Sequence, residues 1–242
     1  MLQTSFLLYQ CLHGLGHALM IYTADRLPFA LALCDDLTGV WAQHSCDGGV
    51  FMQNFNPPDA LSPFQSTYIK PSDPIYPCNA VPVGDKLYCY MQITQNMLNL
   101  NHDDLAKVAP LCLRAERGWV GICYQSFGRD VSGFTQYQPR AALADCRLAG
   151  RYLGDCVFAV VRDYTNNDGN GTRAAGLCAL SPAQVRGICY YGMGTILQTI
   201  EPAGSGLHQA CQALAPAYLN ECLGYLTPGE RALLASAPAN AI

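Results

Sequence analysis

The sequence predicts an all-α protein built from disulfide-linked helical hairpins. Three observations carry this prediction. Thirteen cysteines recur at regular intervals along the 242 residues. Sustained alternation of apolar and polar residues, the pattern of a half-buried strand, is scarce. Hydrophobic residues make up 50% of the chain and charged residues only 13%, which supplies enough apolar material for a sizeable core.

The cysteine spacing predicts a repeat of about 33 residues, a length typical of two-helix repeat units. The cysteines stand at positions 11, 34, 46, 78, 89, 112, 123, 146, 156, 178, 189, 211 and 222, so that long and short gaps alternate. Six full repeats and a C-terminal fragment would form one solenoid-like domain over residues 1–242. The longest gap contains a proline-rich stretch, which predicts a loop inserted at about residues 56–77.

Helix-start signals support the helical interpretation of the individual repeats. Ser181 and Pro182 stand where an N-cap and a first helical residue are expected, before "AQVRGICYYGMGTIL". The stretch "NHDDLAKVAPLC" offers an Asn or Asp cap before another helix. Each repeat is therefore predicted as helix, loop and helix.

In this spacing the chain resembles the cysteine-rich α/α-hairpin proteins of the Sel1-like and tetratricopeptide type, in architecture only. The resemblance covers nearly the whole chain. The aromatic and alanine signatures of tetratricopeptide repeats are missing, and the C-x-x-G-x-G pattern differs from that of Sel1-like repeats. The resemblance implies a helical scaffold that offers a groove, without assigning a function.

Two disulfide connectivities are consistent with the spacing. Pairing across the long gaps leaves Cys222 unpaired, whereas pairing across the short gaps leaves Cys11. We favour the short-gap set, because residues on either side of a tight turn between helices reach the Cα separation of about 5.5–6 Å that a disulfide needs. Its pairs are 34–46, 78–89, 112–123, 146–156, 178–189 and 211–222.

Composition points to an oxidising compartment and argues against nucleic acid as a partner. Thirteen cysteines without close C-x2-C pairs favour disulfides in a secreted or periplasmic protein over zinc knuckles. The net charge of −4 offers no basic face. The uncharged run from Phe6 to Tyr22 contains two histidines and is interpreted as a buried helix. Membrane attachment is expected only through segments outside this chain, which shows no signal peptide.

The stretch "CLHGLGHALM", residues 11–20, has two different faces when drawn as a helix. Cys11 and Gly14 share one face, which we interpret as the packing face. His13 and His17 lie opposite, two and six residues after the cysteine. We call these two positions of every repeat the groove face and predict that it faces a ligand or a peptide partner. We assign to the groove Gly16, Gln95, Arg129, Arg162 and Tyr191.

The histidine pair predicts a metal site. Residues at i and i+4 are neighbours on a helix, so both imidazoles can bind one ion. Gly16 is expected to leave room for the ion. The other candidate ligands are Met20, Met52 and His44. Imidazole with thioether suits copper, and imidazole with water or a carboxylate suits zinc.

The acidic residues near these histidines are interpreted as structural. Asp35, Asp36 and Asp47 are expected to be caps or solvated turn residues. Tyr90, Tyr124 and Tyr190, each one residue after a cysteine, are expected to pack.

The leading functional hypothesis is a metal-binding protein that uses the His13–His17 pair. The alternatives are a metal-dependent enzyme with the same site and a metal-free scaffold that binds a peptide or protein. No catalytic residue can be identified, because no nucleophile stands in a recognisable motif.

Overall fold

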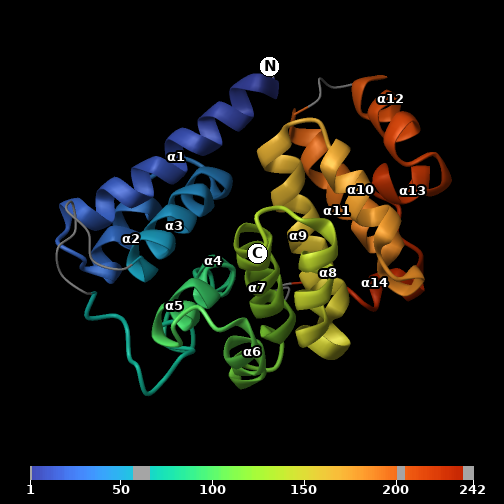
Figure 1. Ribbon diagram of the computed structural model, residues 1–242. Helices are drawn as coiled ribbons and strands as arrows, with labels where there is room; N and C mark the ends of the chain where they lie inside the picture. Colours follow the sequence, from blue (N-terminus) through green and yellow to red (C-terminus); the bar gives the residue numbers. More distant parts are fainter. Residues whose placement is uncertain (1, 57–65, 201–204, 237–242) are drawn as a thin grey trace. The chain divides into compact units, whose positions relative to one another are not determined.

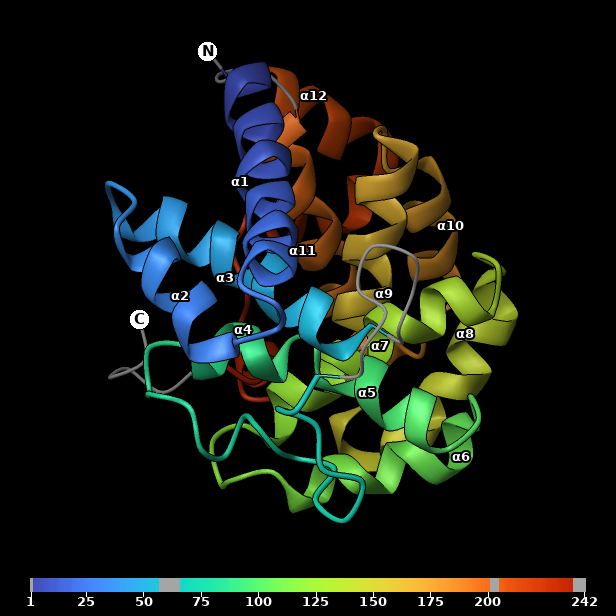
Figure 2. The ribbon, with the colours of Figure 1, turned by 90° about the vertical axis from the view of Figure 1, so that its left-hand side faces the viewer.

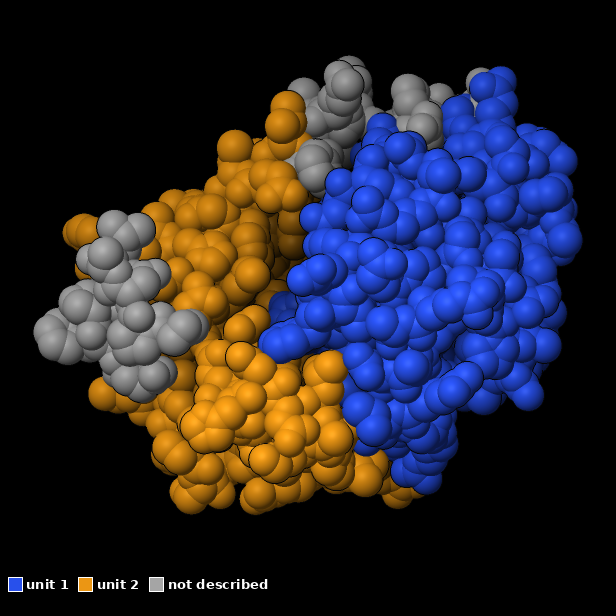
Figure 3. All heavy atoms as spheres, viewed as in Figure 1, with its two compact units in different colours: residues 1–6, 124–236 blue, residues 7–123, 237–242 orange. Residues whose placement is uncertain are grey.

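The computed structural model describes residues 2–56, 66–200 and 205–236, and this part of the chain is helical without strands (Figure 1). The contacts between residues divide the chain into two compact units, coloured in Figure 3. Unit 1 comprises residues 1–6 and 124–236, and unit 2 comprises residues 7–123 and 237–242. The prediction of a single domain over residues 1–242 stays a prediction.

Unit 2 contains most of the N-terminal helices. They are α1 (Leu2–Tyr22), of which residues 2–6 are assigned to unit 1, α2 (Leu27–Asp35), α3 (Val40–Phe55), α4 (Lys86–Tyr90), α5 (Ile93–Leu100), α6 (Leu105–Val108) and the 3-10 helix η1 (Ala109–Arg114). The next helix, α7 (Val120–Phe134), begins in unit 2 and continues into unit 1.

Unit 1 contains the remaining helices. They are α8 (Pro139–Cys146), η2 (Arg147–Tyr152), α9 (Leu153–Asp168), α10 (Thr172–Leu180), α11 (Ala183–Ile200), α12 (Ser205–Leu214), η3 (Pro216–Tyr218), α13 (Leu219–Cys222) and α14 (Pro228–Arg231). Helix α11 packs against α9 on one side and against α13 on another.

Six disulfides connect cysteines across the short gaps, so the favoured connectivity is confirmed. Their Cα atoms lie 5.4–5.7 Å apart. Among the thirteen cysteines, Cys11 is unpaired and exposed. Four of the bridges join a short helix to the first two turns of the longer helix that follows, as Cys34 of α2 joins Cys46 of α3. The cysteine-rich helical-hairpin architecture is therefore present.

One predicted cap is confirmed and another is not. Asp104 precedes α6, and its carboxylate accepts from the backbone N–H groups of Ala106 and Lys107. Ser181 instead closes α10, because its hydroxyl donates to the carbonyl of Leu177 in that helix. The hydroxyl therefore serves the end of one helix rather than the beginning of the next.

The longer helices contact one another through glycines in a recurring register. Each glycine stands five residues after a cysteine, and a side chain on it would overlap the carbonyl oxygen of a cysteine in another helix. The pairs are Gly16 with Cys46 (α1 and α3), Gly128 with Cys156 (α7 and α9), and Gly194 with Cys222 (α11 and α13). Only glycine allows two helix backbones to approach so closely. A solenoid of all the repeats stays a prediction.

The packing face of α1 is the opposite of the one we expected. Gly14, on the Cys11 face, has nothing within 4 Å of an added Cβ, and Leu15 is 37% exposed. Gly16 lies against Cys46 and Val50 of α3, and a Cβ on Gly49 of α3 would overlap the carbonyl oxygen of His13. Helix α1 lies beside α3 (Figures 1 and 2), and the glycine contacts show that the histidine face packs on α3. The space beside Gly16 holds helix backbone, so Gly16 leaves no room for an ion.

The proline-rich insertion is only partly within the described residues. Residues 57–65 lie outside them, so the first half of the predicted loop at 56–77 is not described. Residues 66–77 form turns, as expected, and Cys78 then pairs with Cys89 of α4. The disulfide anchors the end of the loop to the helix that follows.

Candidate functional site

The structure brings the two predicted histidines of α1 together. Their ring centroids lie 5.1 Å apart, and the ring planes are inclined by 71°. Both side chains are half-buried on the face of α1 that packs against α3. The pair is thus positioned by the close glycine contacts between the two helices.

A glutamine of α3 holds the His17 ring. The Nδ1 atom of His17 lies 2.8 Å from Oε1 of Gln53, which is 8% exposed. An amide oxygen only accepts, so this contact is a hydrogen bond when Nδ1 carries the hydrogen, the tautomer that leaves the lone pair on Nε2. The sequence reasoning missed Gln53. Gln53 directly follows the predicted ligand Met52 in the sequence, and this position could have indicated that it lies near the histidines.

Another glycine of α3, Gly48, lies close to the His13 ring. Tyr9 stacks on His13 one turn earlier in α1, with centroids 5.7 Å apart. A Cβ on Gly48 would lie 3.3 Å from Nδ1 of His13 and 3.6 Å from Cδ1 of Tyr88. Tyr88 in turn packs on His44, with centroids 4.9 Å apart. His44 therefore adjoins the His13 surroundings through Tyr88.

The predicted thioether ligands lie in different surroundings. Met20 is fully buried in the core, whereas Met52 is half-buried on α3. Within the described residues, no three His, Cys, Asp or Glu side chains lie close enough together to hold a metal ion. The two histidines are therefore not part of a larger cluster of such side chains in the described part of the chain.

Asp47 is buried, contrary to the expectation of a cap or solvated turn residue. It is 2% exposed, and in the described part of the structure its Oδ1 has no hydrogen-bond partner. Burial, followed by repulsion from Asp85 and Asp35, raises the pKa of Asp47 to about 7. Burial also lowers the pKa of His44.

The sequence contained a signal for this burial. Asp47 stands one residue after its cysteine, the position at which other repeats have the tyrosines that were expected to pack. Those tyrosines are buried in the structure: Tyr90, Tyr124 and Tyr190.

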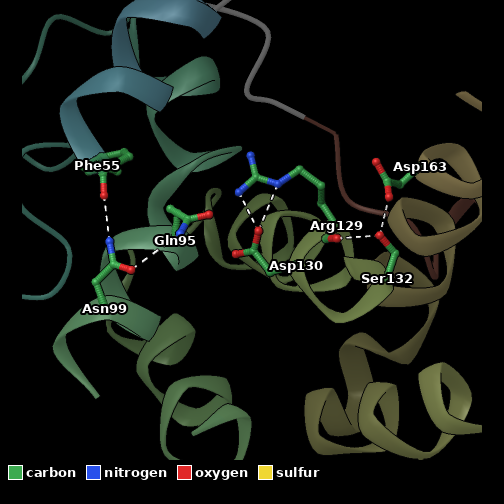
Figure 4. A network of polar contacts seen from close by, with 7 residues as sticks. All are labelled: Phe55, Gln95, Asn99, Arg129, Asp130, Ser132 and Asp163. Carbon is green, nitrogen blue, oxygen red and sulfur yellow. Dashed lines mark hydrogen bonds and ion pairs between the residues drawn. The ribbon is translucent and has the colours of Figure 1, made fainter. Parts of the chain in front are cut away.

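Gln95, a predicted groove residue of unit 2, belongs to a local polar network. Its Nε2 lies 3.5 Å from Oδ1 of Asn99, whose Nδ2 donates to the carbonyl of Phe55 at 2.8 Å (Figure 4). The network joins α5 to the end of α3. Gln95 itself is half-buried.

Arg129, a predicted groove residue of unit 1, is held by its neighbour. Its Nε and Nη2 lie 3.0 and 2.6 Å from Oδ1 of Asp130, which is buried (Figure 4). Ser132 contacts both the Arg129 carbonyl, at 2.7 Å, and the carboxyl group of Asp163. Burial raises the pKa of Asp163. Arg129 is therefore half of an ion pair rather than a solvated cation.

The other groove residues of unit 1 form an aromatic and cationic stack. The guanidinium of Arg162 lies 5.2 Å from the ring centroid of Phe158, one turn earlier in α9. Phe158 stacks on Tyr191 of α11 at 5.9 Å. Phe158 and Tyr191 both stand two residues after a cysteine, as do His13 and Gly48 in unit 2. Equivalent positions of successive long helices therefore adjoin within each unit.

Comparison with protein-family models, curated proteins and solved structures found no match. None of the described helices is both long enough and apolar enough to cross a membrane. The resemblance to Sel1-like and tetratricopeptide proteins is therefore not confirmed, and the structure shows an all-helical chain with six disulfides. Six disulfides are typical of proteins in an oxidising, extracellular compartment.

Proposed function

We propose that this chain is a secreted or periplasmic helical protein that binds a copper or zinc ion through His13 and His17. The observation that carries the proposal is the separation of the two rings. A metal–nitrogen bond of about 2 Å and a tetrahedral angle place the centroids of two bound imidazoles about 5 Å apart. The centroids of His13 and His17 lie 5.1 Å apart without any rearrangement of α1.

The orientation of the rings supports the same proposal. Nδ1 of His17 faces Gln53 of α3, and Nδ1 of His13 faces Gly48 of the same helix. Both rings thus direct Nδ1 towards α3, and we propose the two Nε2 atoms as the ligand atoms. A metal-binding side chain that lies on a helix and is oriented by a neighbouring helix loses little conformational freedom when it binds the ion.

Two imidazoles fill half of a tetrahedral coordination sphere. Water, a small external ligand or the thioether of half-buried Met52 would complete it, and Met52 would favour copper over zinc. His44 is a weaker candidate, since its ring packs against Tyr88. Met20 is the weakest, because its side chain is enclosed in the core. Coordination positions left to external ligands would also allow the alternative function, a metal-dependent enzyme that uses the same site.

The proposal is tested by titrating metal-free protein with Cu²⁺ and with Zn²⁺ by calorimetry. His13→Ala and His17→Ala should each weaken binding at least about 100-fold, since losing a ligand costs more than losing the residue that orients it. His208→Ala, which removes an exposed histidine of α12, is the matched control and should bind as the unaltered protein does. Equal affinity in all four proteins would contradict the proposal and favour the metal-free scaffold.

A further inference from the structure

We infer that Gln53 is a positioning residue that selects Nε2 of His17 as the metal-binding atom. The inference rests on the proposed function, because its consequence is tighter metal binding. The orientation of His17 by Gln53 can itself be measured without metal. Gln53 touches the ligand and not the proposed ion. Its role is to fix where the hydrogen of the neutral imidazole resides.

The contact is well placed for this role. Oε1 of Gln53 lies 2.8 Å from Nδ1 of His17, and Gln53 is 8% exposed, so water competes little for its amide oxygen. Nδ2 of Asn56 donates to the same oxygen at 3.5 Å. A donor from Asn56 favours the amide orientation in which oxygen, and not the NH2 group, faces His17.

The backbone contacts keep Gln53 in this place. Gly16 of α1 lies against the carbonyl of Cys46, and Gly49 of α3 lies against the carbonyl of His13. The two helices are therefore locked where the histidines and Gln53 meet. Rotation of α3 that would withdraw Gln53 would force backbone atoms into one another.

The chemical consequence is selection of one tautomer. With hydrogen on Nε2, the lone pair of Nδ1 would face the lone pairs of Oε1 of Gln53, two acceptors 2.8 Å apart. Hydrogen on Nδ1 makes the contact a hydrogen bond. Nε2 is then unprotonated and available to a metal ion, as when a side chain orients a metal-ligating histidine through its other ring nitrogen.

The repeat in unit 1 lacks this arrangement. In α11 the residues that correspond to Gly48 and Gln53, by distance from the cysteine, are Tyr191 and Ile196. Isoleucine has no acceptor for an imidazole. The glutamine thus occurs in the pair of helices that also has the two histidines.

The test measures the His17 tautomer and the metal affinity in parallel. In metal-free protein at pH 8, ¹⁵N NMR of the imidazole nitrogens should show hydrogen on Nδ1 of His17. Gln53→Leu should shift the population towards hydrogen on Nε2 and weaken Zn²⁺ binding about 10- to 100-fold. Gln53→Glu, which keeps an acceptor oxygen, should retain the Nδ1–H tautomer and bind Zn²⁺ at least as tightly as the unaltered protein.

A second glutamine of α3 serves as the matched control. Gln43 donates to the carbonyls of Asp35 and Leu37, so Gln43→Leu removes structural hydrogen bonds from the same helix. It should lower the melting temperature without changing the His17 tautomer.

The outcomes separate the two proposals. Hydrogen on Nε2 of His17 in the unaltered protein, or an unchanged tautomer and affinity in Gln53→Leu, would overturn the role of Gln53. The expected tautomers with no Zn²⁺ or Cu²⁺ binding by the unaltered protein would instead refute the metal function and leave the orientation of His17 by Gln53 established.

Discussion

The α1–α3 pair of unit 2 and the α9–α11 pair of unit 1 share a backbone register. They differ in the side chains that this register brings into contact. Gly49 of α3 lies against the carbonyl of His13, and a Cβ on Gly192 of α11 would lie 3.1 Å from the carbonyl oxygen of Phe158. Both glycines stand three residues after a cysteine. The glycine contact therefore belongs to the common scaffold.

The side chains on these faces do not repeat. The α1–α3 pair combines His13 and His17 with Gly48, which has no side chain next to the His13 ring. The α9–α11 pair combines Phe158 and Arg162 with the ring of Tyr191, which fills the corresponding space. The two helix pairs thus share their backbone contacts and differ in the side chains at equivalent positions.

Two buried aspartates extend the comparison. Asp155 of unit 1 accepts from Nε2 of Gln125 at 3.0 Å and from the backbone N–H of Ala235 at 2.8 Å. Burial raises its pKa to about 6, against the opposing effect of these two hydrogen bonds. Asp47 of unit 2 has like-charged neighbours instead, and its pKa is higher, about 7. The environment of unit 2 therefore favours a neutral Asp47.

The largest effect is expected from the disulfides, which both units share. A bridge that closes a loop of about 11 residues contributes about 3 kcal/mol by restricting the unfolded chain. Cys34→Ala/Cys46→Ala in unit 2 and Cys178→Ala/Cys189→Ala in unit 1 should each lower the free energy of unfolding by about this amount, measured by urea denaturation. Cys11→Ala should have no comparable effect. Unchanged denaturation midpoints in the double variants would show that these bridges do not stabilise the units.

The next effect compares two glycines of α1. Gly16→Ala forces a methyl group into the backbone of α3 and should cost about 1–3 kcal/mol. Gly14→Ala places it in open space on the same helix and should stabilise by about 0.5–1 kcal/mol, because alanine loses less backbone entropy than glycine. Thermal unfolding of both variants measures the difference. Equal effects would mean that the histidine face does not pack on α3.

The third effect concerns pH and sets Asp47 apart from Asp155. Since native Asp47 keeps its proton to about pH 7 and an unfolded aspartate loses it near 3.8, the folded state binds more protons between these values. The free energy of unfolding should therefore fall as the pH rises from about 4 to about 7.

Replacing this carboxyl group tests its contribution. Asp47→Asn should stabilise the protein by about 1–2 kcal/mol at pH 8, less than the full effect of the pKa shift because the new amide donors also lack partners. The gain should vanish near pH 4. Asp155→Asn, as the comparison, keeps an oxygen for its two donors and should flatten the pH dependence only up to about pH 6. Urea denaturation across pH 4–8 measures the free energy of unfolding. If Asp47→Asn left its dependence on pH unchanged, the raised pKa of Asp47 would be contradicted.

The smallest effect belongs to the aromatic stack of unit 1. Tyr191→Leu removes the ring that stacks on Phe158 and should cost about 0.5–1.5 kcal/mol. The corresponding position in unit 2 is Gly48, which has no ring and so contributes no stacking energy there. A stability unchanged within error in Tyr191→Leu would show that the stack is not part of the packing of α9 on α11.

The sequence by itself predicted the all-helical class, favoured the disulfide pairs that the structure contains and placed His13 and His17 side by side on one helix face. These features depend on short distances along the chain: the cysteines of a pair are 10 to 12 residues apart, and the histidines are separated by one helical turn. Local geometry alone brings such residues together.

Only the tertiary structure decided which face of α1 packs, how deeply Asp47 is buried and which side chain orients His17. Both faces of α1 carry a glycine, Gly14 or Gly16, and the helical angle distinguishes the faces without telling which of them meets α3. That choice depends on whether another backbone, here at Cys46 and Gly49, can approach. Gln53 likewise lies 36 residues from His17 and reaches it only because α3 packs against α1.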